Sequence, residues 1–300
     1  MESNKGILLE SGTNELEIVE FEVASNKFGI NVIKVKEIIQ PIEVTFIPHA
    51  HPHVEGIVQL RGEVLPVVDM QKVLGVPTQN YSEQQKYIVA EFNKQKVVFH
   101  VDNVTKIHRI SWDQIEKPSD MYQGGGSQVI GVIKREDGML LLLDFERIMV
   151  DINPESGIQI ESVKKLGERE RSDKKIIVAE DSPLLRKLLN DTLGEAGYTN
   201  IEFFENGKDA YEFLEFSATR GDIADYVQLI VTDIEMPQMD GHHLTKKIKS
   251  SAQLQKLPVI IFSSLITDDL RHKGLEVGAE EQISKPEIAE LILKIDQYIL

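Results

Sequence analysis

The sequence predicts a multidomain protein in which an all-β first half precedes an α/β doubly wound parallel sheet. A chain of 300 residues, at about 100–200 residues per domain, suggests two domains. The first half holds many short strand-like runs separated by Gly, Asn, Pro and Asp, as in a small barrel or sandwich. The second half alternates short apolar runs with helical stretches, as in a parallel sheet covered on both faces.

Composition excludes several classes of protein. The absence of cysteine excludes disulfides, thiolate metal sites and a cysteine nucleophile. A net charge of -16 would repel a phosphate backbone, so we expect no nucleic-acid partner. The longest apolar run, Met139–Leu143, is far shorter than the roughly 20 residues that span a bilayer, and the start MESNKGILLESG has no apolar signal region. We therefore expect a cytoplasmic protein without membrane insertion.

A charged segment divides the chain into its two predicted domains. Residues 151–173, DINPESGIQIESVKKLGERERSD, contain one Pro, two Gly and a dense run of mixed charge with few large apolar side chains. Such a composition is typical of a linker or a solvated helix. We therefore assign 1–150 to the first domain, 151–173 to the linker and 174–300 to the second domain.

Strands and helices of both domains can be assigned from their patterns. The predicted strands of the first domain are LEIVEFEV, KFGINVI, GEVLPVVDM, KYIVAEF, KVVFHV and GVIKRED. Those of the second are KIIVAED, VQLIVTD and PVIIFSS. Helices are predicted over Pro183–Ala196 and Gly207–Phe216, and Ser182 is placed to cap the first of them.

Open parallel sheets place their sites at the carboxyl ends of the strands, so the residues that follow each apolar run are the candidates. In chain order these are Glu180 and Asp181, Asp233, Ser263 and Ser264, and Lys285 before Pro286. Three converging carboxylates would repel one another unless a cation lies among them. An oxygen-only ligand set favours Mg²⁺. Each residue alone could simply end a strand on a solvated rim, but the ordered set argues against that interpretation.

This ordered set, with TDIEMPQMDG around Asp233, resembles the receiver domain of two-component response regulators across nearly all of 174–300. The resemblance implies that Asp233 accepts a phosphoryl group as nucleophile. It also implies that the carboxylates of Glu180, Asp181 and Asp233, with the backbone carbonyl of Glu235, hold Mg²⁺.

The same resemblance implies roles for two further residues, with Ser263 donating to a phosphoryl oxygen and Lys285 pairing with the developing charge. Phosphoryl transfer needs little more from a protein than such positioning and neutralisation. One departure is Gln282, three residues before the lysine, where receivers often carry Tyr or Phe as a rotamer switch. We expect Gln282 not to bury as an aromatic ring would. A response to phosphate should then use the 263–265 loop and the surface around Gln282.

The first domain resembles the CheW-type coupling domain of bacterial chemotaxis. The resemblance rests on Pro48, Gly56, the Leu60–Gly62 turn and the Leu65–Asp69 strand, and it covers about 15–150. It implies two linked small β-barrels that bind chemoreceptor tips and the histidine kinase CheA.

Three features of the first domain bear on function or packing. Arg61 is a candidate partner-binding residue because a turn presents it outward, although most surface residues carry little binding energy. His49, His51 and His53 could present a zinc site from one face of an extended chain, but no fourth ligand is evident and two neighbouring prolines favour a rigid loop. Trp112 is expected in the core or at a barrel seam.

A coupling domain followed by a receiver resembles the CheV-type chemotaxis coupling proteins, which implies a non-enzymatic signalling adaptor. The alternative is a response regulator with a catalytic β-domain output, such as a phosphatase or methylesterase. Against it, 1–150 lacks a Gly-x-Ser-x-Gly elbow and a His-Glu-x-x-His helix, and Gly124–Gly126 lacks the residues that complete a phosphate loop. A transcription factor would need a recognition helix or a basic patch, and neither is found.

Overall fold

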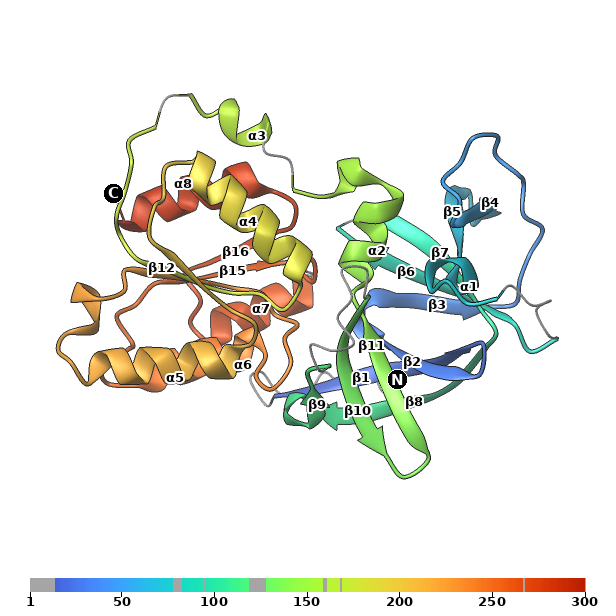
Figure 1. Cartoon of the computed structure of the whole chain (residues 1–300), viewed down its shortest axis with the longest axis horizontal. Coiled ribbons are helices and arrows are strands. Elements are labelled where there is room, and N and C mark those ends of the chain that lie inside the picture. Colours follow the sequence, from blue (N-terminus) through green and yellow to red (C-terminus); the bar gives the residue numbers. More distant parts are fainter. Residues whose placement is uncertain are drawn as a thin grey trace, which may run out of the picture. The chain divides into compact units, whose positions relative to one another are not determined.

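The computed structural model describes residues 14–77, 83–93, 95–118, 128–158, 161–167, 169–266 and 268–299. These residues form two compact units, each with its own sheets (Figure 1). The first consists of Glu17–Ile110 and Gln114–Ile158, and the second is built mainly from Gln159–Leu300.

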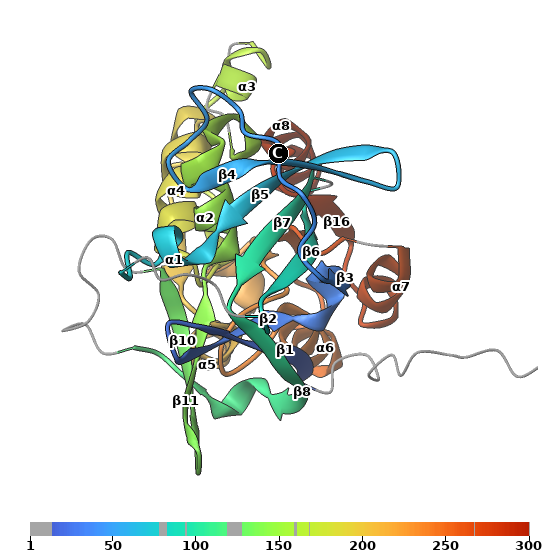
Figure 2. The ribbon, with the colours of Figure 1, turned by 90° about the vertical axis from the view of Figure 1, so that its right-hand side faces the viewer.

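The first unit is β-rich, as predicted. Its six-stranded sheet has the order β8-β1-β2-β11-β10-β9, and its five-stranded sheet has the order β3-β6-β7-β5-β4 (Figure 2). The strands are β1 (Glu15–Val23), β2 (Asn26–Asn31), β3 (Val35–Ile39), β4 (Val54–Leu60), β5 (Glu63–Asp69), β6 (Lys86–Phe92), β7 (Gln95–Val101), β8 (Asn103–Ser111), β9 (Ile115–Glu116), β10 (Val129–Arg135) and β11 (Gly138–Leu143). The helices are α1 (Met70–Val73) and α2 (Phe145–Ile152). Each of the six predicted runs overlaps one of these strands.

An aromatic cluster forms part of the core of this unit. The ring of Phe145, at the start of α2, lies 5.1 Å from that of Phe99, 5.6 Å from that of Phe92 and 6.4 Å from that of Phe21. All four side chains are at most 5% exposed. Aromatic side chains bury large apolar areas, so this cluster holds α2 and three strands together. Trp112, which groups with the second unit, is buried as expected. Gly124–Gly126 lie outside the described residues.

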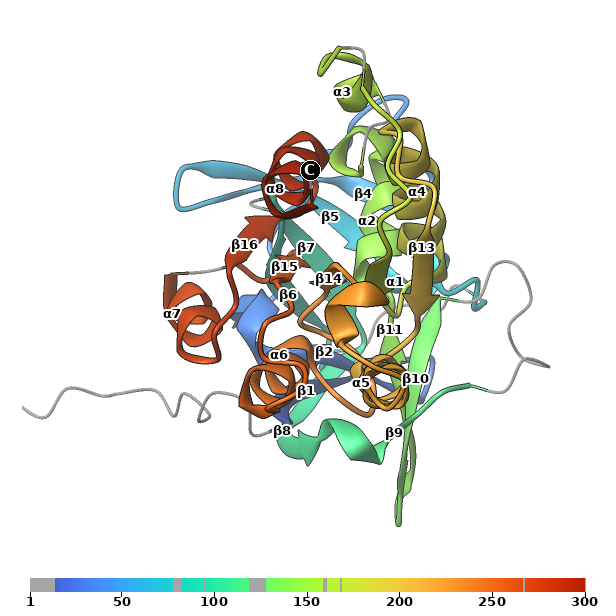
Figure 3. The same ribbon diagram turned by 90° about the vertical axis from the view of Figure 1, so that its left-hand side faces the viewer.

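The second unit is a doubly wound parallel sheet with the order β13-β12-β14-β15-β16. Its strands are β12 (Ile176–Ala179), β13 (Ile201–Phe204), β14 (Leu229–Thr232), β15 (Val259–Ser263) and β16 (Glu281–Ser284). Its helices are α3 (Glu161–Lys164), α4 (Pro183–Glu195), α5 (Gly207–Ala218), α6 (Gly241–Ser250), α7 (Asp268–Glu276) and α8 (Ile288–Ile299). Helices α4 and α8 cover one face of the sheet, and α5, α6 and α7 cover the other (Figures 1 and 3).

The three predicted strands and both predicted helices of this unit are confirmed. Strands β12, β14 and β15 are buried at every position, which explains their unbroken apolar runs. Ser182 caps α4 as expected, since its side chain accepts a hydrogen bond from the backbone N–H of Leu185. Strands β13 and β16 were not among the predicted runs, because their sequences IEFF and EQIS are short and partly polar.

The carboxyl end of the predicted linker packs on this second unit. The guanidinium of Arg169 lies 2.6 and 2.7 Å from the two carboxylate oxygens of Asp296 on α8, and it donates to the carbonyl of Ala196. Asp296 also accepts a hydrogen bond from the buried hydroxyl of Tyr198, and burial raises the pKa of that hydroxyl. Arg169 therefore fixes this end of the segment to α8. Within the described residues, no helix combines the length and apolarity that crossing a bilayer requires.

Candidate functional site

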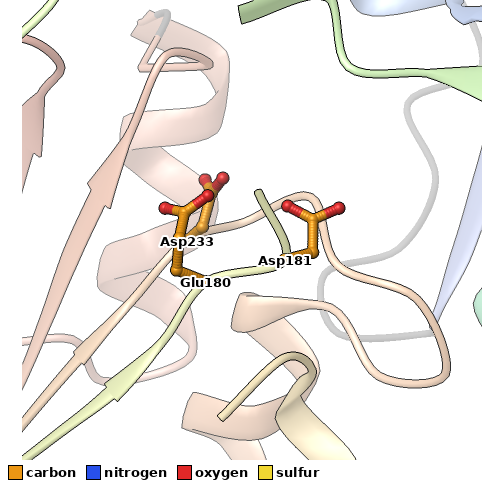
Figure 4. Close-up of side chains that lie close together, drawn as sticks. All are labelled: Glu180, Asp181 and Asp233. Atoms are coloured by element: carbon orange, nitrogen blue, oxygen red, sulfur yellow. The ribbon is translucent and has the colours of Figure 1, made fainter. Parts of the chain in front are cut away.

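Two loops bring three carboxylates together at the carboxyl edge of the parallel sheet. Strands β12 and β14 pair so that Ala179 lies opposite Thr232, and the residues that follow are therefore neighbours. Glu180 and Asp181 follow β12, and Asp233 follows β14. Carboxylate oxygens of the three lie within 4.8 Å of one another, and the three side chains project on the same side of the strand ends (Figure 4). The strand order reverses between β12 and β14, which is where sheets of this type place their sites.

Lys285 supplies the positive charge of the site. Its Nζ lies 2.8 Å from Glu180 Oε2 and 2.9 Å from Asp233 Oδ2, and the three side chains are at most 4% exposed. Three carboxylates and one ammonium leave a formal charge of two negative units. A site of this charge attracts a divalent cation.

The loop that carries Asp233 is held closely. Asp233 Oδ1 accepts a hydrogen bond of 2.6 Å from the backbone N–H of Ile234. The N–H of Gly241 donates to the carbonyl of Ile234, and a Cβ at Gly241 would lie 1.9 Å from the carbonyl oxygen of Asp233. Only glycine permits this close approach, which explains why Gly241 follows Asp240 at the end of TDIEMPQMDG.

Ser263 ends β15 beside these groups and is fully buried. Its hydroxyl accepts a hydrogen bond of 3.3 Å from the N–H of Leu265, and its carbonyl accepts from the N–H of Lys285. Glu235 lies two residues beyond Asp233 and is partly buried. The site therefore brings together the strand-end residues that the sequence singled out. The roles predicted for all of them, and for Glu235, remain predictions.

The donor set fits Mg²⁺. The ligands are carboxylates without histidine or cysteine, their oxygens lie close enough to share one ion, and the residual charge matches a divalent cation. Glu180, Asp181 and Asp233 would hold the ion, with the backbone carbonyl of Glu235 as the further expected ligand.

Arg186 is a site residue that the sequence analysis missed. Its guanidinium Nη1 lies 2.8 Å from the carbonyl oxygens of both Glu180 and Asp181, and its Nη2 lies 2.9 Å from Glu205 Oε1. The available signal was a basic residue in the first turns of the helix that follows an acidic pair. The sequence carries no stronger signal, because two of the acceptors are backbone carbonyls.

The expectation for Gln282 is wrong. Its side chain is 8% exposed, and its Nε2 donates a hydrogen bond of 2.8 Å to the carbonyl of Arg271 on α7. Gly274 makes this burial possible, because a Cβ there would lie 2.1 Å from Gln282 Oε1. An amide therefore occupies the interior by packing on a glycine and bonding to a helix carbonyl.

In the first unit, Arg61 occupies the tip of the β4–β5 hairpin. Arg61 and Gly62 have φ angles of 51° and 88°, as the two central residues of a tight hairpin turn require. The Arg61 side chain is 79% exposed, and its guanidinium lies 2.9 Å from Glu37 Oε2. It is thus presented outward, as predicted from the turn, and its binding role remains a prediction.

The three histidines do not form a metal site. His51 Nδ1 accepts a hydrogen bond from the N–H of His53, and the two rings meet edge to face at 4.7 Å. His49 has a φ angle of 62°, so the chain is not extended there. Among the described residues, the acidic trio is the one group of three histidine or carboxylate ligands close enough to share an ion.

Comparison with known families assigns both halves of the chain. Residues 17–153 match the CheW-like domain, and residues 176–296 match the response regulator receiver domain. The protein is therefore a CheW-like domain followed by a receiver domain.

Over nearly its whole length, the chain is similar to CheV chemotaxis proteins. It is 29% identical over 286 residues to chemotaxis protein CheV3 of Helicobacter pylori, covering 91% of each chain. It is 25% identical over 309 residues to CheV1 of the same organism, covering 95% of this chain and 94% of the relative. Chemotaxis protein CheW of Thermotoga maritima is 29% identical over 154 residues, which is 50% of this chain and 98% of that protein. These similarities support a non-enzymatic chemotaxis coupling adaptor with a receiver domain, and they do not favour a catalytic β-domain output.

Two titratable groups lie buried at the start of α6, next to the site. Asp240 caps the helix by accepting from the N–H of His243, and burial raises the pKa of its carboxyl to about 6. Burial, with repulsion from Lys273, lowers the pKa of His242 to about 4, and its Nε2 has no hydrogen-bond partner. Both groups are therefore poised to be neutral in mildly acidic solution.

The two groups should give opposite pH dependences of stability. Between about pH 4 and 6 folded Asp240 retains a proton that the unfolded chain has lost, so its contribution to stability falls as pH rises. Between about pH 4 and 6.5 unfolded His242 binds a proton that the folded chain does not, so its contribution rises with pH. The wild type gains this contribution between pH 6.5 and 5, whereas Asp240→Asn, which can still cap the helix, does not. We therefore expect the unfolding free energy of Asp240→Asn to fall by about 1 kcal/mol relative to the wild type over this range.

The unfolding free energy of His242→Leu should rise relative to the wild type over the same pH range. The double variant should have nearly the same pH dependence of stability as the wild type. The measurement is the unfolding free energy of the receiver domain at both pH values, from native-state hydrogen exchange of β14 amides in urea. Parallel pH dependences in all four proteins would contradict the assignment.

Proposed function

We propose that the chain is a cytoplasmic adaptor that couples chemoreceptors to the histidine kinase CheA and is controlled by phosphorylation of Asp233. In this proposal 1–150 is the coupling domain, 151–173 the linker and 174–300 the receiver domain. The carrying observation is that a CheW-like domain shares one chain with a receiver in which Glu180, Asp233 and Lys285 meet. Neither nucleic acid nor direct membrane insertion forms part of this function.

The proposed reaction transfers a phosphoryl group to a side-chain oxygen of Asp233. That oxygen attacks phosphorus, an acyl phosphate forms, and the bond to the donor's leaving group breaks. Mg²⁺, when bound, supplies charge neutralisation at the transferred oxygens. The ammonium group of Lys285 would pair with the phosphoryl group. The Ser263 hydroxyl would donate a hydrogen bond to a phosphoryl oxygen. The N–H of Ile234 already orients the Asp233 carboxylate.

Charge explains why a cation is needed at this site. The trio with Lys285 carries a formal charge of two negative units, and a phosphoryl group adds about -1.5 to -2 more. Without a divalent ion, an incoming phosphate would approach a site of its own sign. The proposal therefore requires labelling to depend on Mg²⁺.

Asp233→Asn should abolish labelling by a small phosphodonor in the presence of Mg²⁺. The amide has nearly the same shape but cannot form an acyl phosphate, and EDTA should abolish labelling of the unmodified chain. The matched control is Asp225→Asn, which changes an exposed aspartate of the same domain and should label fully. Label that persists in Asp233→Asn would show that another residue is the acceptor.

Arg61→Glu should weaken the binding of 1–150 to a receptor tip or to CheA by about tenfold, because it reverses a charge at a presented turn. Pull-down or titration against each partner measures the effect in the full chain. Lys134→Glu is the matched control, since Lys134 is 69% exposed and pairs with Glu116 in the same half. Unchanged binding of both partners would make Arg61 a solvated residue without a coupling role.

Ser263→Ala should permit phosphorylation of Asp233 but flatten its effect on the rest of the chain. A charge-assisted hydrogen bond is worth about 1.5–3 kcal/mol, enough to shift a two-state loop equilibrium roughly 10- to 100-fold. The readout is the phosphate-dependent change in hydrogen exchange across 14–173. Ser264→Ala is the control, because that buried hydroxyl has no hydrogen-bond partner. A full response in Ser263→Ala would assign the coupling to a different group.

A further inference from the structure

Arg186 links the start of α4 to the residues that follow β12 and β13. It lies in the first turn of α4, and its side chain is 17% exposed. The side chain folds back so that one nitrogen, Nη1, lies 2.8 Å from the carbonyl oxygens of both Glu180 and Asp181. Its second nitrogen, Nη2, lies 2.9 Å from Glu205, the residue after β13. The guanidinium therefore contacts the backbone carbonyls of the acidic pair.

These contacts fix the backbone from which two of the three carboxylates project. Carbonyl groups of consecutive residues commonly point in different directions, and one nitrogen that donates to both restrains the peptide plane between them. The N–H of Glu180 is bonded on its other side to the carbonyl of Phe204 in β13. The Glu180 carboxylate is in turn held by Lys285. Arg186 also holds the carbonyl of the next residue, Asp181.

We propose that Arg186 is a positioning residue for divalent-cation binding, acting by holding the Glu180 and Asp181 carbonyls so that their carboxylates converge with Asp233. The inference rests on the proposed function, because it takes the acidic trio to be the Mg²⁺ site. It assigns to Arg186 a contribution that does not involve contact with the metal or the phosphoryl group.

Charge and geometry make opposite predictions for this residue, which allows them to be separated. A positive charge beside the trio opposes cation binding, so loss of the charge alone would tighten Mg²⁺ binding. Loss of the two-carbonyl contact would weaken it, because the ligands are no longer held in place. Lysine keeps the charge, but its side chain is shorter and has one nitrogen, so it cannot bind the two carbonyls and Glu205 together. Glutamine is shorter still and uncharged.

The test measures Mg²⁺ affinity of the full, unphosphorylated chain by isothermal titration with MgCl₂. Arg186→Lys and Arg186→Gln should each raise the Kd for Mg²⁺ by about tenfold. Lys187→Gln, which removes an exposed charge from the neighbouring position, should bind Mg²⁺ as well as or slightly better than the wild type. Thermal unfolding in EDTA is recorded for every protein, since a purely structural role would lower stability without changing the Kd.

Wild-type affinity in Arg186→Lys together with tighter binding in Arg186→Gln would overturn the inference and leave Arg186 acting by charge alone. A lowered melting temperature with unchanged Kd in both variants would overturn it in favour of a structural role. In either case a normal wild-type titration leaves the proposed function intact. Failure of the wild-type chain itself to bind Mg²⁺ would overturn the proposed function and this inference with it.

Discussion

The buried ammonium of Lys285, between the carboxylates of Glu180 and Asp233, is the contact on which the parallel-sheet unit depends. Burying an isolated charge costs several kcal/mol, and removing one member of a buried set leaves its partners uncompensated. Lys285 follows β16, two strands away from β14, and strands lie about 4.8 Å apart. Only a long side chain spans that separation. The lysine therefore constrains the register of the sheet as well as the charge of the site.

Around this contact the two sides of the site differ in how firmly they are held. On the Asp233 side, Gly241 packs on the Asp233 carbonyl and the N–H of Ile234 fixes the carboxylate. On the β15 side, Ser263 accepts one long hydrogen bond, and the hydroxyl of Ser264 has no partner. The oxygens of a phosphoryl group on Asp233 would thus lie between the closely packed Asp233 loop and the 263–265 loop. The serine hydroxyls of the second loop would break at most one weak hydrogen bond on moving. This asymmetry favours the β15–α7 loop as the part that responds.

The sequence could predict the residues at the strand ends because their chemistry follows directly from the apolar runs that precede them. It could not predict features that depend on a partner distant in the chain. The burial of Gln282 needs the notch at Gly274, and the raised pKa of Asp240 needs the packing around α6. Arg186 was missed because its contacts are to backbone carbonyls, which carry no side-chain signature. Strands β13 and β16 were missed because edge positions do not require continuous apolar runs.

The charged segment before β12 gives the last example of the same limit. Mixed charge at 151–173 is typical of a solvated linker, yet Arg169 is 13% exposed and bound to both oxygens of Asp296. Asp296 lies on α8, which begins three residues after Lys285 and buries an apolar face on the sheet. Because a helix packed in this way moves as a unit, any change at Lys285 that displaces α8 also displaces Arg169. The charge pattern that predicts a linker therefore also contains the residue that fixes the end of that segment to α8.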